Sequence, residues 1–281
     1  MQNITVIGAG TMGHGIAHVS ALAGYDVYLC DMDAGVVDRA LATIAANMQK
    51  GVDRGKLDAA AMESALPRIT GTTRLADACD GADLVIEAVP EKLALKRSIF
   101  QTVEQHCDAI LGTNTSSLSI AGIAEGLNHP ERVIGLHFFN PVHIMKLLEI
   151  IVHAGTSDDT LKACLAYGER IGKSCITVND FPGFATSRLG VCLGMEAIRM
   201  VEQGVASPED IDTAMVLGYR HPIGPLKLTD LVGLDVRMHI GEYLAKELNN
   251  PAFEPPALMR RMVSDGRLGK KSGHGFYEWN A

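Results

Sequence analysis

The sequence lacks the marks of secreted, membrane-spanning and polyanion-binding proteins. Its six cysteines are scattered without a Cys-x-x-Cys pair, a pattern of buried thiols in a reducing compartment rather than of a disulfide framework. No run is long and apolar enough to cross a bilayer, and the first expected strand follows Met1 too closely for a signal or transit peptide. The net charge of −8 argues against nucleic-acid and anionic-membrane partners. We therefore expect a cytoplasmic protein.

The chain is larger than one nucleotide-binding domain. Its 281 residues, 47% of them apolar, are enough for a sizeable core and for a second, smaller domain. Because the chain as a whole is acidic, any polyanionic ligand must find a local basic patch.

The first 31 residues contain a complete dinucleotide-binding fingerprint. An apolar strand at residues 4–7 runs into Gly8-Ala9-Gly10-Thr11-Met12-Gly13, and an apolar-faced helix follows over residues 16–23. A second apolar run, residues 27–30, ends in Asp31. This order of strand, glycine loop, helix, strand and acid is the start of a Rossmann unit, whereas a glycine turn alone would be a weak signal.

Each part of the fingerprint has a mechanical reason. Gly8 allows a tight turn, Gly10 lets the backbone approach a pyrophosphate, and Gly13 lets the helix pack close to the sheet. The helix N-terminus presents free N–H groups to the phosphates. Asp31, 18 residues after Gly13, stands where a carboxylate binds the ribose hydroxyls. Asp31 would repel a 2′-phosphate by as much as about 4 kcal/mol per unit charge at about 4 Å and an effective dielectric of about 20, and Asp33 adds a second negative charge nearby, so we expect NAD rather than NADP.

The rest of the pattern predicts two domains. Strands and helices alternate as far as residue 178, which predicts an α/β Rossmann domain with a doubly wound, largely parallel sheet over residues 1–180. Beyond a Pro-Gly break every long segment has helical period, which predicts an all-α domain over residues 181–281. The expected later strands are residues 83–89, 109–112, 133–136, 147–152 and 175–178, and the expected later helices are residues 36–65, 93–106, 184–201, 208–217, 226–248 and 256–264.

Three polar clusters follow expected strands, at residues 87–96, 114–117 and 137–140. Ligands of open α/β sheets bind outside the carboxyl ends of the strands, so these clusters are candidates for a site. His137 is the best candidate for a general base, because only histidine titrates near neutrality without help. On position alone, a structural histidine satisfied at a strand end is an equally good interpretation.

Several motifs stand in a fixed order along the chain. They are Gly8-Ala9-Gly10-Thr11-Met12-Gly13, Glu87-Ala88-Val89-Pro90-Glu91, Asn114-Thr115-Ser116-Ser117-Leu118, His137-Phe138-Phe139-Asn140-Pro141, Leu147-Leu148-Glu149, Asp180-Phe181-Pro182-Gly183-Phe184 and residues 266–277. Together they resemble the L-3-hydroxyacyl-CoA dehydrogenases over essentially the whole chain, and the length fits the compact bacterial 3-hydroxybutyryl-CoA dehydrogenases. The resemblance implies NAD-dependent oxidation of a (3S)-3-hydroxyacyl-CoA to the 3-ketoacyl-CoA, or the reverse. The similarity in length to the 3-hydroxybutyryl-CoA dehydrogenases implies a short acyl chain.

The resemblance also implies roles for the site residues. His137 would take the proton of the 3-hydroxyl as hydride leaves for the nicotinamide, and Glu149 would fix the tautomer of His137 and stabilise its cation. Ser116 would hydrogen-bond the reacting oxygen of the substrate. Without the resemblance, Glu149 could be an edge-strand charge, although an acid in so apolar a run must be paired if it is buried.

The cofactor and CoA contacts follow from the same resemblance. The residues that would contact NAD, besides the glycine loop and Asp31, are Glu91, Lys96, Asn114, Ser116 and Asn140. Lys50 and Arg54 share a helix face and would bind the CoA nucleotide. A solvated charge is the alternative for Lys96, and a solvated charged face is the alternative for Lys50 and Arg54.

One position departs from the family pattern, which has Asn in the turn before Arg188. Ser187 stands there, a donor and acceptor with a shorter reach than the amide, and it is a candidate substrate contact. The terminal motif, with Trp279, is expected to pack on the first domain. His14 and His18 have helical spacing but no evident third ligand, so no metal is expected.

Two other functions and one partner were weighed against the same residues. A hydroxyacid dehydrogenase of the 3-hydroxyisobutyrate type would use a catalytic lysine, and an NAD-binding sensor or structural relative would not turn over. The set of Ser116, His137 and Glu149 favours the acyl-CoA enzyme. Apolar stripes in the helical domain, together with the habit of the family, predict a homodimer; the residues are Leu228, Leu231, Leu234 and Val236.

Overall fold

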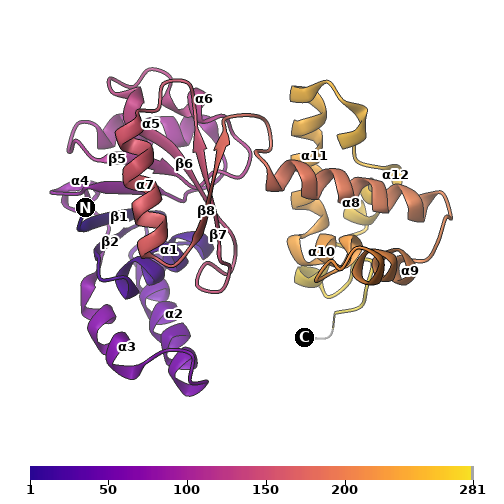
Figure 1. Cartoon of the computed structure of the whole chain (residues 1–281), viewed down its shortest axis with the longest axis horizontal. Coiled ribbons are helices and arrows are strands. Elements are labelled where there is room, and N and C mark those ends of the chain that lie inside the picture. Colours follow the sequence, from indigo (N-terminus) through magenta and orange to yellow (C-terminus); the bar gives the residue numbers. More distant parts are fainter. Residues whose placement is uncertain (280–281) are drawn as a thin grey trace. The chain divides into compact units, whose positions relative to one another are not determined.

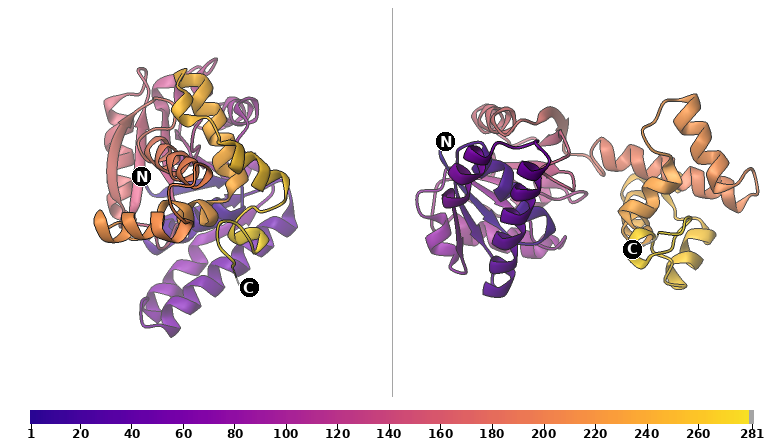
Figure 2. Two further views of the ribbon diagram at one scale, coloured as in Figure 1. Left: turned by 90° about the vertical axis from the view of Figure 1, so that its right-hand side faces the viewer. Right: turned by 90° about the horizontal axis from the view of Figure 1, so that it is seen from below.

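The computed structural model describes residues 1–279, which divide into two compact units, Met1–Asp180 and the residues from Phe181 onward. The first unit holds an eight-stranded sheet in the order β3-β2-β1-β4-β5-β6-β7-β8, flanked by helices (Figure 1). Every neighbouring pair is parallel except β6 and β7. The predicted Rossmann sheet and the helical second unit are thereby confirmed, and Figure 2 gives both from two further directions.

The strands of the sheet are short and its centre is apolar. β1 and β4 are almost wholly buried, and β6 is buried throughout, as expected of parallel strands covered on both faces. The strands are β1 (Asn3–Ile7), β2 (Asp26–Cys30), β3 (Ile69–Thr72), β4 (Leu84–Glu87), β5 (Ile110–Thr113), β6 (Val133–Phe138), β7 (Leu147–Val152) and β8 (Ser174–Asn179).

Seven α-helices belong to the described part of the first unit. They are α1 (Thr11–Leu22), α2 (Ala34–Asp53), α3 (Ala59–Ala65), α4 (Leu75–Cys79), α5 (Leu93–Val103), α6 (Ile120–Ala124) and α7 (Asp158–Arg170). Short 3-10 turns lie at Leu66–Arg68 and Pro130–Arg132. Among residues 1–279, no helix is both long and apolar enough to cross a membrane.

For residues 34–72 one expectation was wrong and one strand was missed. The single helix expected at 36–65 is two helices, because Gly55 has a left-handed φ of 64° and Asp58 caps α3 by accepting from the N–H of Ala60. The strand β3 was not predicted. It is a short, half-exposed edge strand containing Gly71, where a Cβ would lie 2.5 Å from a methyl of Val37 on α2. A strand with so few apolar residues gives no period to recognise.

In the described residues of the second unit, 181–279, five α-helices surround a separate core. They are α8 (Thr186–Glu202), α9 (Pro208–Thr213), α10 (Pro225–Val232), α11 (Leu234–Leu248) and α12 (Ala257–Ser264), with a π-helical turn at Ala214–Gly218 and 3-10 turns at Pro251–Phe253 and Lys270–Ser272. The helix expected at 226–248 was wrong in one respect. Gly233, with φ 102°, breaks it into α10 and α11.

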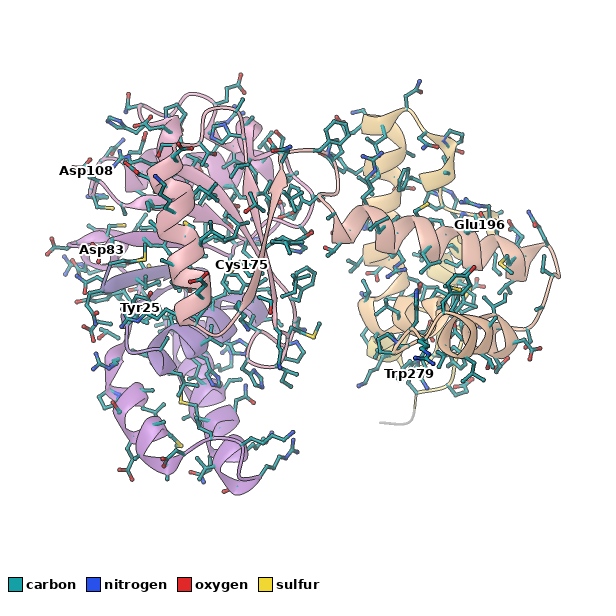
Figure 3. The ribbon with its side chains drawn as sticks, in the orientation of Figure 1. Tyr25, Asp83, Asp108, Cys175, Glu196 and Trp279 are labelled. Atoms are coloured by element: carbon teal, nitrogen blue, oxygen red, sulfur yellow. The ribbon has the colours of Figure 1, made fainter. Side chains whose placement is uncertain are left out.

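The C-terminal segment packs on the second unit itself. The carboxylate of Asp230, on α10, accepts from the backbone N–H groups of Phe276 and Tyr277 and from Nε1 of Trp279. Asp212 accepts from the hydroxyl of Tyr277 in the same way. Figure 3 labels Trp279 among the helices of this unit. The expectation that the tail packs on the first domain was therefore wrong, because a buried carboxylate in its own unit holds it.

Candidate active site

The glycine loop after β1 leaves a free helix end. Gly8 has φ 96°, and a Cβ there would lie 2.8 Å from the carbonyl oxygen of Ala88; at Gly13 a Cβ would meet the carbonyl of Gly8. A Cβ at Gly10 would meet none of the described atoms, so this side of the loop is open. Within residues 1–279, no side chain caps the N-terminus of α1 and no acid lies in its first turn. The loop therefore fits the pyrophosphate of a dinucleotide.

Asp31 lies directly after β2, beside this loop. One of its carboxylate oxygens accepts from the backbone N–H of Ala9 at 2.8 Å, which fixes the side chain against the glycine loop. Asp33 has another task, because its carboxylate accepts from the N–H groups of Gly35 and Val36 and so caps α2. Asp31 is therefore held beside the glycine loop, while the charge of Asp33 stabilises a helix.

A buried ionic cluster lies where β4 ends. Nζ of Lys96 lies 2.8 Å from Glu87 and 3.3 Å from Glu91, and the side chains of Glu87 and Lys96 are 0% and 1% exposed. The other oxygen of Glu87 accepts from the hydroxyl of Thr113 at 2.8 Å, and the N–H of Val89 donates to the first at 2.7 Å. The interpretation of Lys96 as a solvated charge was therefore wrong. We call Glu87, Lys96 and Glu91 the ionic cluster.

Burial and charge act in opposite directions on the two acids of this cluster. Burial raises the pKa of Glu87, and the attraction of Lys96 opposes that rise without cancelling it. Burial would also raise the pKa of Glu91, but Lys96 and hydrogen bonds from Thr115 and Ser116 outweigh it, so that its pKa lies below the ordinary value. Glu91 is thus the more firmly ionised of the pair.

Glu91 holds the turn that carries Ser116. Its Oε1 accepts from the hydroxyl of Thr115 at 2.5 Å and from the backbone N–H of Ser116 at 2.9 Å. The hydroxyl of Thr115 in turn accepts from the N–H of Leu118, which closes the turn after β5. We call residues 115–118 the serine turn. Its position is set by a glutamate from the loop after the neighbouring strand.

His137 and Glu149 form a buried pair. The antiparallel register of β6 and β7 sets them opposite each other, and Nδ1 of His137 lies 2.6 Å from Oε2 of Glu149. Their residues are 7% and 0% exposed. The ring of Phe139 lies 4.5 Å from that of His137, centre to centre. Oδ1 of Asn114 accepts from the N–H of Phe138, which joins this pair to the strand that ends at the serine turn. Glu149 is therefore not an edge-strand charge.

A basic cleft of about 840 Å³ lies elsewhere in the first unit, between the ends of α1 and α2 and two loops. Lys50 and Arg54 both line it. Its other cationic lining residues are Lys56, Lys146, Arg170 and Lys173, and no Asp or Glu is among the described residues that line it. We call it the basic cleft. The cations from the segment after β6 and from the end of α7 were not predicted, because they are far from α2 in sequence.

Two histidines line the basic cleft at its inner side. The ring of His18, 3% exposed, stacks on that of His143 with centres 5.1 Å apart and planes 4° from parallel. Burial lowers the pKa of His18 to about 4, with His143, His14 and Lys173 adding to the effect. Within residues 1–279, no group of three His, Cys, Asp or Glu side chains is placed to hold a metal ion.

The remaining predicted residues lie at two other places. Asn140 is exposed in the loop that joins β6 to β7. Ser187 belongs to the second unit, where it lies half-buried in the first turn of α8. Glu87 and Thr115 were given no role in advance. Glu87 could have been found by the argument already applied to Glu149, that an acid in an apolar strand must be paired.

Comparison with known proteins adds independent findings. Residues 3–181 match the family model of the 3-hydroxyacyl-CoA dehydrogenase NAD binding domain, and residues 183–279 match that of the C-terminal domain. The chain is 41% identical to a 3-hydroxybutyryl-CoA dehydrogenase of Clostridioides difficile, over 99% of this chain and 100% of that protein. It is 40% identical to one of Bradyrhizobium diazoefficiens, over 99% of this chain and 96% of that protein.

A solved structure is equally similar. The crystal structure of (S)-3-hydroxybutyryl-CoA dehydrogenase from Ralstonia eutropha superposes with a TM-score of 0.95 at 40% identity, over all of both chains. The match includes the helical second unit as well as the Rossmann sheet, since both chains are covered in full.

Proposed function

The chain belongs to the 3-hydroxyacyl-CoA dehydrogenase family, and from this premise we propose how its own residues carry out the reaction. It is an NAD-dependent dehydrogenase of 3-hydroxyacyl-CoA thioesters. We infer that its preferred substrate is of short chain, (3S)-3-hydroxybutyryl-CoA or acetoacetyl-CoA in reverse, because similar proteins over the full length carry that name. The observation that carries the mechanism is the buried pair of His137 and Glu149.

His137 is proposed as the general base. With Nδ1–H donated to Glu149, the neutral ring keeps the lone pair of Nε2 for the proton of the substrate 3-hydroxyl. Glu149 is buried beside the ring, where its carboxylate would stabilise the imidazolium that forms. Phe139 packs against the ring and limits its rotation. In the reductive direction the same nitrogen returns the proton to the oxygen.

Ser116 is proposed to hydrogen-bond the reacting oxygen of the substrate. Its turn is fixed by Glu91 and lies at the end of the strand beside β6, so its hydroxyl and the ring of His137 come from neighbouring strand ends. Hydrogen bonds of Ser116 and His137 with the same substrate oxygen would orient that oxygen toward the base. Ser187, from the second unit, is proposed as a further contact of the substrate.

NAD is proposed to bind along the carboxyl ends of the first strands. Gly8-Ala9-Gly10-Thr11-Met12-Gly13 and the end of α1 would hold the pyrophosphate, and Asp31 the adenosine ribose. Further contacts with the cofactor are assigned to Glu91, Lys96, Asn114, Ser116 and Asn140. When bound, NAD⁺ accepts the hydride that leaves C3 of the substrate. Asp31 disfavours a 2′-phosphate, so we expect NADH to be preferred to NADPH.

The basic cleft is proposed to bind the CoA nucleotide. It gathers six cations in a chain whose net charge is −8, so it is a local site for the phosphates of a polyanionic ligand. Lys50 and Arg54 stand one turn apart at the C-terminal end of α2, where they can grip one phosphate from two sides.

We further propose a homodimer in the cytoplasm, formed through the second unit. Part of the predicted stripe is core, since Leu234 is fully buried, but Leu231 and Val236 are more than 40% exposed. Leu189 and Leu217 are exposed above 70% on the same unit. So much exposed aliphatic surface favours an interface. Sedimentation equilibrium at micromolar concentration should give twice the mass of the chain, 30.0 kDa, and a monomer would contradict the proposal.

The function is tested by the loss of NADH absorbance with acetoacetyl-CoA and its longer homologues, each with NADH and with NADPH. We expect the highest kcat/KM for acetoacetyl-CoA with NADH. A higher value for a longer acyl chain would contradict the short-chain preference. Absence of oxidation with every thioester would favour a relative that binds the cofactor without turnover.

A further inference from the structure

Glu87 is the one fully buried carboxylate at the carboxyl edge of the sheet to which the proposed reaction gives no task. It ends β4, between β1 and β5. Both of its oxygens are used: Val89 N–H and Lys96 donate to one, and the Thr113 hydroxyl donates to the other. A buried ion that is so fully paired is costly to alter, because a lost partner leaves a charge without compensation.

A continuous series of contacts leads from Glu87 to the serine turn. Lys96 lies 2.8 Å from Glu87 and 3.3 Å from Oε2 of Glu91. Oε1 of that same Glu91 accepts from the hydroxyl of Thr115 and from the N–H of Ser116. Lys96 is therefore shared by two glutamates, one of which holds the turn. Glu87 is the closer of the two, and its attraction for Lys96 competes with the attraction between Lys96 and Glu91.

We infer that Glu87 is a positioning residue for Ser116, acting through Lys96 and Glu91. The inference rests on the proposed role of Ser116 in the reaction. With Glu87 ionised, Lys96 stays at the end of β4, and Glu91 is left to hold the serine turn. Without that charge, Lys96 has Glu91 as its remaining ionic partner among the residues of the cluster. The attraction then moves Glu91 toward Lys96 and loosens its bonds to the turn.

Glu87→Gln tests this relation with little change of volume. The amide keeps an oxygen that can accept from Val89 or Thr113. It also presents an NH2 group, which cannot accept a hydrogen bond from Lys96. We expect kcat with acetoacetyl-CoA and NADH to fall about tenfold, since small displacements of a reacting contact cost that much or more. We expect KM for the thioester to change less than kcat. Glu104→Gln is the matched control, because Glu104 is a 4% exposed carboxylate that accepts from the N–H groups of Asn128 and His129.

The route through Ser116 is tested by a double-mutant cycle. In the Ser116→Ala background we expect Glu87→Gln to change kcat by less than about twofold, because the contact it disturbs is already absent. A tenfold loss in both backgrounds would overturn the inference, as would an unchanged kcat in Glu87→Gln alone. If Ser116→Ala itself leaves kcat unchanged, the proposed role of Ser116 fails, and that result is read separately from the effect of Glu87.

Hydrogen exchange gives a readout independent of turnover. In Glu87→Gln the amide of Ser116 loses its acceptor, so a peptide covering residues 114–118 should exchange at least about tenfold faster, while Glu104→Gln leaves it unchanged. Equal exchange in wild type and Glu87→Gln would contradict the inference. If Glu87→Gln does not fold, Glu87→Asp keeps a charge but shortens its reach to Lys96 by one methylene, and the same cycle and exchange measurement apply with outcomes of the same direction.

Discussion

Two histidines lie almost wholly inside the first unit, and their surroundings are opposite in charge. His137, at the end of β6, faces the carboxylate of Glu149 at 2.6 Å. His18, on α1, stacks on another histidine and lies near Lys173, and its Nδ1 has no hydrogen-bond partner within the described chain. One site can stabilise a protonated ring and the other cannot.

Burial alone does not decide whether a histidine can act as a base. Both rings are shielded from water, so exposure would rank them as equal candidates for a base. Beside the carboxylate of Glu149 a protonated His137 ring would be stabilised, whereas burial, with His143, His14 and Lys173 adding to it, lowers the pKa of His18 to about 4. The proposed proton-transfer region and the proposed anion-binding region of this unit thus differ in the sign of the charges beside their histidines.

The largest effect is expected when the carboxylate is removed from the His137 site. In Glu149→Gln the amide can present its NH2 group to Nδ1, which favours the wrong tautomer and withdraws the charge that stabilises the imidazolium. We expect kcat to fall by about 10³-fold with the fold retained. Stopped-flow oxidation of NADH with acetoacetyl-CoA, beside circular dichroism, measures both. A loss smaller than about tenfold would mean that Glu149 is not coupled to proton transfer.

The second prediction concerns the neutral state of His18. Its pKa is about 4 when folded and 6.5 when unfolded, so between these values the unfolded chain binds the proton and the folded one does not. Stability therefore falls as pH drops from 6.5 to about 4, by up to about 3 kcal/mol from this residue. In His18→Leu that part of the loss should vanish. Urea unfolding at several pH values measures it, and parallel curves for wild type and variant would contradict the assignment.

The third prediction concerns the proposed binding of the CoA phosphates by the basic cleft. Lys50→Ala/Arg54→Ala should raise KM for acetoacetyl-CoA about tenfold or more, since each charged hydrogen bond contributes about 1.5–3 kcal/mol. Acetoacetyl-pantetheine lacks the nucleotide, so its KM should be the same in wild type and variant. Lys162→Ala is the control, a lysine with a 74% exposed side chain outside the cleft. An equal rise in KM for both thioesters would show that Lys50 and Arg54 do not bind the nucleotide.

The smallest effect is expected at Ser187. Ser187→Asn restores the residue of the family pattern on the first turn of α8, and we expect kcat/KM to stay within about threefold of wild type, less than 1 kcal/mol. Steady-state assays with acetoacetyl-CoA measure it. Complete loss of turnover with folding intact would show that Ser187 does more than stand in for the amide.

The apolar runs predicted the centre of the sheet, because burial on both faces leaves a local pattern. The pairing of His137 with Glu149 was implied by the family resemblance, and the residues alone indicated only that a buried acid in an apolar run must have a partner. Other features depend on contacts distant in sequence. Gly233 lies within a continuous helical pattern, and only its positive φ in the structure shows that the helix ends there. The strand β3 has too few apolar residues for a strand pattern to be recognised. The ionic cluster could not be predicted, because the sequence does not show that the side chain of Lys96 is buried against Glu87.

His137 is proposed to exchange the proton with the substrate, and its removal tests this role. In His137→Ala, single-turnover oxidation of bound NADH by acetoacetyl-CoA should slow by at least about 10³-fold, while the Kd for NADH, from fluorescence titration, should stay within about threefold of wild type. A variant that turns over near the wild-type rate, with cofactor binding intact, would contradict the account.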